Sequence, residues 1–295
     1  MKRIGFLACE TTLPGAGERR GDAFEHDLMV GALAPALRDH DLELDVIDWE
    51  APISAFAGLE MVVLGTAWNY QDKSKTFLAR LDELEARGIT VCNAPDTVRW
   101  NITKSYLREL SENGAATIPT LWREIVTYKG ALEAMEVFET DRIVVKRQIG
   151  AGAEGQELLV RSALPDAGWS FGHPAMLQPY LPAIASEGEL SFIFIDGELS
   201  HGVRKHAAKG EYRIQSLYGG TESVHTPTAQ EEQAARAIIA ALPFDPPLYA
   251  RIDMLRSDDQ LLLMEAEMIE PYLYPVQGPL LGERLAAAIA KRVHQ

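Results

Sequence analysis

Apolar runs and amphipathic stretches alternate along the first third of the chain. Such alternation is typical of parallel strands that are covered by helices. We expect strands at 4–8, 42–47, 61–65 and 89–92, and helices at 23–39 and 75–87. The turn signal Asn-Ala-Pro-Asp at 93–96 then ends the pattern. The sequence therefore predicts a first, Rossmann-like domain at 1–95.

The middle of the chain predicts a small α+β unit at 96–177. A helix at 101–114, which carries Leu107 and Leu110 on one face, leads into this unit. We expect a strand that ends with residues 143–146, then a glycine-rich segment, and two further strands at 157–161 and 175–177.

The remaining segment, 178–295, predicts a second α+β unit. Asp196-Gly197 between alternating apolar residues is a strong hairpin signal, which joins strands at 190–195 and 199–205. A helix at 229–242, two strands around Ile252 and Leu262, and an amphipathic core helix at 280–294 complete it. The fold class is thus α/β and α+β.

Composition and charge exclude several classes of function. The chain has 295 residues, of which 47% are apolar and 24% charged, as in an ordinary globular protein. Its formal net charge of -15 disfavours nucleic acid and anionic membranes as partners, because both attract clustered Lys and Arg. An anionic ligand must therefore meet a local basic patch.

The cysteines and the first residues predict a cytoplasmic protein. Cys9 and Cys92 are too few for a disulfide framework and lack the spacing of a zinc site. The apolar run that follows Lys2-Arg3 ends at Glu10, too early for a signal-peptide core, and no run is long enough to cross a membrane.

The most informative chemistry lies on the two strands near the C-terminus. Because side chains alternate along a strand, Arg251 and Asp253 share one face, and Glu265 and Glu267 share one face of the next strand. A connecting loop centred on Asp259 pairs Asp253 with Glu265. Three carboxylates then converge, and hard oxygen ligands of this kind suit Mg²⁺. The alternative is an acidic, solvent-facing strand edge.

Two further segments have the residues of a nucleotide site. Lys146 ends a strand and precedes a loop of small residues that includes Gly152, where backbone amides could approach an anion. No Gly-Lys-Ser/Thr follows, so this is not a Walker loop; a flexible hairpin is the alternative. At 178–182, Gln-Pro-Tyr-Leu-Pro forms a stiff linker that could read a purine edge or serve as a plain interdomain hinge.

A basic group follows the predicted hairpin. Arg204, Lys205 and His206 end a strand, and Lys209 and Arg213 follow in a strongly acidic chain. Such a concentration is a candidate anion site, with surface solvation as the alternative for Lys209.

Taken in order, these motifs resemble the ATP-grasp superfamily, which includes glutathione synthetase and D-alanine:D-alanine ligase. The segments 250–253 and 264–267 look like its Arg-x-Asp and Glu-x-Asn strands, with Glu267 in place of the usual Asn. The segments 65–70 and 98–101 are similar to a branch that contains a D-cycloserine-forming ligase. The resemblance implies an ATP-grasp fold, in which a parallel-sheet domain precedes two α+β subdomains that clasp ATP.

The resemblance also implies an ATP-dependent carboxylate-amine ligase that acts through an acyl phosphate on small amino-acid-like substrates. It implies ATP and Mg²⁺, with Mn²⁺ as a substitute, and is consistent with a homodimer. A regulatory protein without ligase activity and a kinase that stops at phosphoryl transfer are the alternatives. The implied residues are Lys104, Lys146, Gly152, Gln178, Tyr180, Leu181 and Glu189 (or Glu187) for the nucleotide, Asp253, Glu265 and Glu267 for the metal, and Arg251, Arg213 and Lys205 for catalysis.

Overall fold

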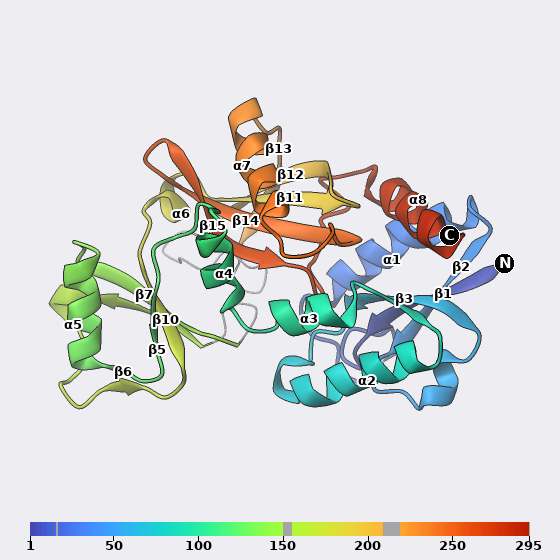
Figure 1. The fold of residues 1–295 in the computed structure, drawn as a ribbon, viewed down its shortest axis with the longest axis horizontal. Helices are drawn as coiled ribbons and strands as arrows, with labels where there is room; N and C mark the ends of the chain where they lie inside the picture. Colours follow the sequence, from blue (N-terminus) through green and yellow to red (C-terminus); the bar gives the residue numbers. More distant parts are fainter. Residues whose placement is uncertain (16, 150–154, 209–218, 295) are drawn as a thin grey trace.

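The computed structural model describes residues 1–15, 17–149, 155–208 and 219–294. Three sheets and one short ribbon organise these residues. In Figure 1 the second sheet lies at the left, the third near the centre and the first at the right.

The first sheet is parallel, with the strand order β2-β1-β3-β4. Its strands and its two helices lie within two residues of the predicted bounds. They are β1 (Lys2–Ala8), α1 (Ala23–Arg38), β2 (Leu42–Asp48), β3 (Leu59–Thr66), α2 (Ser74–Ala86) and β4 (Thr90–Cys92), with the 3-10 turns η1 (Ile53–Phe56) and η2 (Gln71–Lys73). The two faces of the sheet bury separate cores, one against α1 and one against α2.

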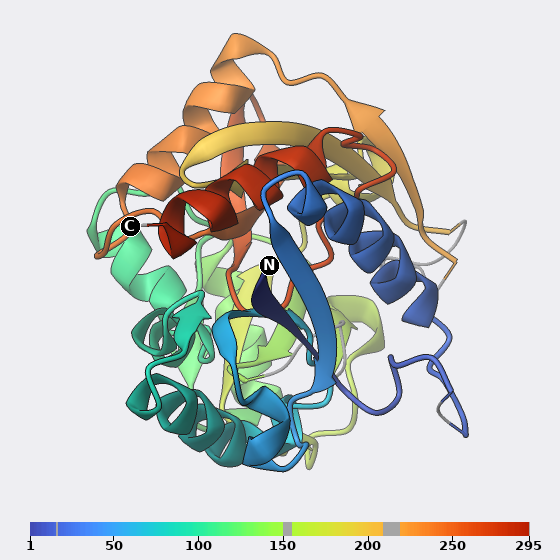
Figure 2. The same cartoon turned by 90° about the vertical axis from the view of Figure 1, so that its right-hand side faces the viewer.

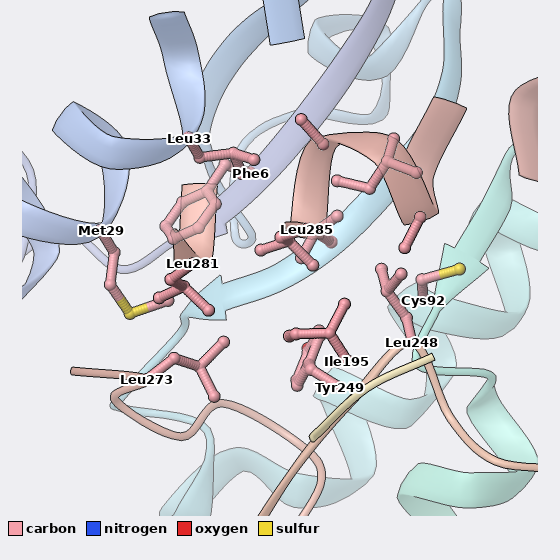
Figure 3. Close-up of a cluster of buried hydrophobic side chains, with 14 of the residues drawn as sticks. Phe6, Met29, Leu33, Cys92, Ile195, Leu248, Tyr249, Leu273, Leu281 and Leu285 are labelled. Atoms are coloured by element: carbon pink, nitrogen blue, oxygen red, sulfur yellow. The ribbon is translucent and has the colours of Figure 1, made fainter. Parts of the chain in front are cut away.

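The C-terminal helix α8 (Leu281–Val293) packs on this first sheet and across α1, as Figure 2 shows. Its apolar residues Leu281 and Leu285 point toward Phe6 and Leu33 (Figure 3). The helices approach closely at Gly282, where an added Cβ would lie 2.2 Å from the carbonyl oxygen of Ala32. The amphipathic helix is therefore a core helix, as predicted.

The second sheet is antiparallel, with the order β5-β10-β7-β8. Helix α5 packs on one of its faces and, like the short strands β5, β6 and β9, was not predicted. The elements are β5 (Leu121–Arg123), β6 (Val126–Thr127), α5 (Tyr128–Val137), β7 (Arg142–Arg147), β8 (Gln156–Val160), η3 (Arg161–Ala163), β9 (Ser170–Phe171) and β10 (Ala175–Pro179).

The third sheet has the order β13-β12-β11-β14-β15. The hairpin at Asp196-Gly197 is confirmed, and both residues have positive φ, 51° and 80°, as a tight hairpin turn requires. The elements are α6 (Ala183–Ser186), β11 (Glu189–Ile195), β12 (Glu198–His206), β13 (Thr221–His225), α7 (Ala229–Ala240), β14 (Tyr249–Ser257) and β15 (Gln260–Glu267).

The predicted helix at 101–114 is shorter, α4 (Tyr106–Glu112), and a separate helix that was not predicted, α3 (Pro95–Asn101), precedes it. Pro95 begins α3, where its fixed φ suits the first helical turn. The break between the helices includes Lys104, whose backbone N–H donates to the carbonyl of Gln148 in the second unit, at 2.7 Å. Among the helices of the described residues, none is both long and apolar enough to cross a membrane.

Candidate active site between the second and third sheets

The two acidic strands pair as the sequence predicted, with Asp253 opposite Glu265 and Arg251 opposite Glu267. The loop is centred between Asp258 and Asp259, because Ser257 pairs with Gln260. A bulge between Asp253 and Met254 then shifts the register by one residue. The predicted pairing is thus correct, although it arises from a two-residue loop and a bulge.

Asp253 is the most enclosed of these carboxylates, with 1% of its surface exposed. It accepts from both sides: Arg251 Nε lies 3.1 Å from each of its oxygens, and Ser191 Oγ donates to Oδ1 at 2.5 Å. Lys205 Nζ adds a third contact at 3.3 Å. Burial opposes ionisation, but Arg251 and Lys205 outweigh it and lower the pKa of Asp253 to about 2.

Glu189 and Lys205 continue this buried network on β11 and β12. Glu189 is fully buried and lies against the Lys205 ammonium, and neither of its oxygens accepts a hydrogen bond of ordinary geometry from the described residues. Burial raises the pKa of Glu189 to about 7, although Lys205 opposes it. Burial and the neighbouring Arg251 lower the pKa of Lys205, but the charges of Asp253 and Glu189 outweigh them and raise it.

Of the two lysines assigned to the nucleotide, Lys104 contacts Glu265 directly and Lys146 lies near enough to affect its pKa. Lys104 Nζ lies 2.9 Å from Glu265 Oε1, and Lys146, at the end of β7, is 9% exposed. Burial lowers the pKa of Lys146, and the neighbouring Lys104 adds to that, while Glu265 opposes it. Lys104 and Lys146 together lower the pKa of Glu265 in spite of its burial. The chain therefore brings Lys104, Lys146 and Glu265 together from three separate segments.

Glu267 completes the carboxylate set at the end of β15. Arg251 Nη2 lies 2.5 Å from Glu267 Oε1, and Arg251 Nη1 donates to the carbonyl of Tyr272 at 3.0 Å. Burial raises the pKa of Glu267, although Arg251 lies against it. Arg251 thus bridges both strands and fixes the position of two carboxylates.

The donor chemistry of Asp253, Glu265 and Glu267 fits Mg²⁺, which prefers carboxylate oxygens. In this structure each of the three faces a Lys or Arg side chain. Over the described ranges, no group of three or more His, Cys, Asp or Glu side chains is arranged to hold a metal ion. A magnesium ion would therefore replace lysine or arginine contacts at these oxygens.

The linker assigned to adenine borders an apolar cluster between the second and third sheets. Tyr180 and Leu181 pack with Leu262 and Met264 of β15 around a buried core of Ile118, Ile184 and Leu255. The Tyr180 ring also lies 3.7 Å from the guanidinium carbon of Arg142, and its backbone N–H donates to the Arg142 carbonyl at 2.9 Å. Gln178, which is 2% exposed, donates to Thr120 Oγ1 at 3.0 Å. An apolar surface beside backbone groups suits a planar base.

The two carboxylates considered for ribose have different surroundings. Glu189 lies in the network with Lys205, whereas Glu187 is held by Arg256 at 2.8 Å and lies 3.6 Å from Arg204. The choice between them stays a prediction. The sites assigned to Gly152 and Arg213, and the neighbouring Lys209, lie outside the described residues.

Sequence reasoning missed the segment Met268-Ile269-Glu270, which crosses from β15 to the first sheet. Its backbone is held by four hydrogen bonds from side chains of other segments. They are Asn93 Nδ2 to Met268 O (2.7 Å), Met268 N to Asn101 Oδ1 (3.0 Å), Tyr249 Oη to Ile269 O (2.8 Å) and Trp68 Nε1 to Glu270 O (2.9 Å). The acidic Glu270, three positions after the Glu-Ala-Glu of β15, was the available signal.

Comparison with known proteins shows which proteins this chain is similar to. Residues 4–93 match a family described as the N-terminal domain of D-cycloserine synthetase DcsG. The cycloserine biosynthesis protein DcsG of Streptomyces lavendulae is 29% identical over 291 residues, which cover 88% of this chain and 92% of that protein.

Solved structures extend the similarity over almost the whole chain. A crystal structure of D-cycloserine synthetase DcsG matches with a TM-score of 0.80 and 23% identity and covers 99% of each chain. The D-alanine–D-alanine ligase of Bacillus anthracis matches with a TM-score of 0.67 and 15% identity, over 100% of this chain and 98% of that one. The ATP-grasp ligase PsnB matches with a TM-score of 0.65 and 13% identity, over 99% and 98%.

Proposed function

We propose that this chain, which has the ATP-grasp fold, is an ATP-dependent, ADP-forming carbon–nitrogen ligase. It would activate the carboxylate of a small amino-acid-like substrate as an acyl phosphate and join it to a nitrogen. The observation that carries the proposal is the ion pair of Lys104 with Glu265, with Lys146 nearby, beside the Arg251–Asp253–Lys205 network. Cations and carboxylates from separate units meet there, as phosphoryl transfer requires.

Each residue has a role that follows from its chemistry. Lys104 and Lys146 would hold the phosphates of ATP, and the linker with Gln178, Tyr180 and Leu181 would hold the adenine. Glu189, whose oxygens lack regular hydrogen bonds from the described residues, would accept from the ribose hydroxyls; Glu187 is the competing choice.

Asp253, Glu265 and Glu267 would hold Mg²⁺, which supplies charge neutralisation at the transferred phosphoryl group. Arg251 donates to the Tyr272 carbonyl and lies against Asp253 and Glu267, and it would donate to the oxyanion formed by nitrogen attack once Mg²⁺ replaces its contacts with these carboxylates. Lys205 lies on the same network and would stabilise the same charge.

The substrate class follows from the relatives. One relative is described as a cycloserine biosynthesis protein and another as a D-alanine–D-alanine ligase. We therefore propose a small amino-acid derivative that is joined to an amine or cyclised on its own nitrogen, in the cytoplasm.

The test is ADP release by the purified protein with MgATP. The panel contains amino acids, dipeptides and O-ureidoserine, with and without added amines. Turnover that depends on a carboxylate and yields an amide supports the ligase. A stable phosphorylated product without an amide would identify a kinase, and ATP binding without turnover across the panel would favour a regulatory protein.

The Glu265→Gln variant separates the site from the fold. We expect loss of turnover and an unchanged circular dichroism spectrum, because a neutral amide removes the charge that faces Lys104 and Mg²⁺ and keeps the shape. Glu283, which is exposed on α8, offers a matched Glu→Gln control that should retain full activity. Normal turnover in Glu265→Gln would contradict the metal assignment.

A further inference from the structure

Glu270, at the junction of the first and third sheets, is an acidic side chain with no basic partner among the residues that the structure describes. Gln71 Nε2 donates to its Oε1 at 3.1 Å. By contrast, each carboxylate of the neighbouring network (Glu189, Asp253, Glu265 and Glu267) lies within ion-pair distance of a Lys or Arg nitrogen. Among the described residues, no Lys, Arg or His nitrogen lies within that distance of Glu270.

The electrostatic surroundings of Glu270 favour a cation. Burial raises the pKa of Glu270 to about 8, and the negative charge of Glu267 adds to this effect. Burial raises the pKa of the Tyr70 hydroxyl well above its usual value, and the negative charges of Glu270 and Glu267 add to this effect. A positively charged group that binds between them would relieve this repulsion.

Contacts with Trp68 fix the backbone of Glu270. Its carbonyl accepts from Trp68 Nε1 at 2.9 Å, and the Trp68 ring is itself covered by the Arg20 guanidinium, whose carbon lies 5.0 Å from the ring centroid. Arg20 Nη1 also donates to the Trp68 carbonyl at 3.1 Å. The carboxylate is therefore presented by a rigid backbone, which is what a recognition site needs.

The location is where a substrate would lie. Trp68, Tyr70 and Gln71 follow the carboxyl end of β3 in a parallel sheet, the edge at which ligands of α/β sheets bind. On the other side, Glu270 is three positions beyond Glu267, at the end of the strand that carries the proposed metal ligands. When the substrate carboxylate is activated near Arg251, the substituent on the adjacent carbon would lie toward Glu270.

We propose that Glu270 binds the ammonium group of the substrate and thereby selects amino acids over simple carboxylic acids. This inference rests on the proposed ligase function, since it concerns the substrate of the same site. Tyr70 and Gln71 would form the sides of the ammonium site, and Glu270 would supply the charge.

The test compares substrate pairs that differ only in the ammonium group. Isothermal titration calorimetry measures O-ureidoserine against 3-(ureidooxy)propanoate, and alanine against propanoate, in the presence of Mg²⁺ and a non-hydrolysable ATP analogue. In the wild type we expect the ammonium member of a pair to bind about 10- to 100-fold more tightly, the range for a charge-assisted hydrogen bond. In Glu270→Gln we expect this preference to disappear and the affinity for the nucleotide analogue to stay unchanged.

Two measurements exclude a merely structural role. Thermal unfolding of Glu270→Gln should match or exceed that of the wild type, because a neutral amide of the same shape replaces a buried carboxyl whose charged form is disfavoured by burial and by Glu267. Asp72→Asn, which removes an exposed charge next to Gln71, should keep the preference. A purely structural effect would weaken both members of a pair alike.

The outcomes separate this inference from the ligase proposal. If carboxylate-dependent turnover occurs but the wild type does not prefer the ammonium member, or Glu270→Gln keeps the preference, the role of Glu270 is wrong and the ligase stands. If the preference exists and depends on Glu270 while no acid supports ADP release, the ligase proposal fails and this inference holds. If neither pair binds the wild type, the inference is wrong.

Discussion

The replacement Glu189→Gln tests whether burial or ion pairing controls the charge of Glu189. The carboxyl is fully buried beside Asp253, and these effects raise its pKa from 4.5 to about 7 against the opposing influence of Lys205. At pH values between 4.5 and about 7, the Glu189 carboxyl is protonated in the folded chain and ionised in the unfolded chain. The free energy of unfolding of the wild type therefore falls as the pH rises through this window.

The expected magnitude follows from the same two pKa values. Between pH 5 and pH 7 the folded-state carboxyl retains most of its proton, so linkage gives a change of about 2 kcal/mol. Glu189→Gln carries no such proton, and its stability relative to the wild type should rise by that amount across this range. For a chain of this size, this corresponds to roughly 4 °C in Tm.

The assay is thermal unfolding of both proteins at matched pH values from 5 to 8, with the exposed Glu283→Gln as control. The control should follow the wild type at every pH. The absolute stability of Glu189→Gln is not the test, because Lys205 loses one of its two carboxylate partners. Parallel curves for Glu189→Gln and the wild type, or a difference of the opposite sign, would refute the reasoning and show that Lys205 dominates.

Three other variants test separate parts of the structure. Lys146→Ala should weaken MgATP binding about tenfold or more in calorimetry, because it removes a buried cation from the proposed phosphate site; unchanged affinity would count against that site. Gly282→Ala should cost about 1–3 kcal/mol in chemical denaturation, because its Cβ would lie 2.2 Å from the Ala32 carbonyl oxygen; equal or higher stability, from the better helix propensity of Ala, would contradict the close packing. Burial lowers the pKa of His201 to about 4 from 6.5, so the stability that its neutral form contributes should be lost as the pH falls from 6.5 toward 4. His201→Gln should show a shallower loss of Tm than the wild type over that range, and an equally steep loss would argue against a buried neutral imidazole.

Much of the fold could be predicted because local patterns and tertiary structure agree. The parallel sheet and both of its helices follow from apolar periodicity, and the Asp196-Gly197 hairpin follows from the positive φ that those two residue types tolerate. The predicted helix at 101–114 failed for a tertiary reason. The backbone of Lys104 donates to Gln148, a partner that no local pattern indicates.

The site could be predicted only in part. The face shared by Arg251 and Asp253 follows from strand alternation, but their pairing with β15 depends on a bulge that the sequence does not announce. The predicted role of Lys104 came from family resemblance, whereas its contact with Glu265 is a property of the folded chain. Glu270 was missed because its significance lies in what surrounds it: Gln71 and Trp68 contact it although they lie 199 and 202 positions earlier in the chain.

The packing of α8 on α1 has a consequence for synthesis on the ribosome. The first sheet, α1 and α2 emerge early, but the apolar face around Phe6, Met29 and Leu33 is covered by Leu281 and Leu285, which are translated much later. At about 5–20 residues per second, the interval between these segments is of the order of tens of seconds. During that time the nascent domain carries an exposed apolar surface, and a chaperone that binds such surfaces would find it there until α8 arrives.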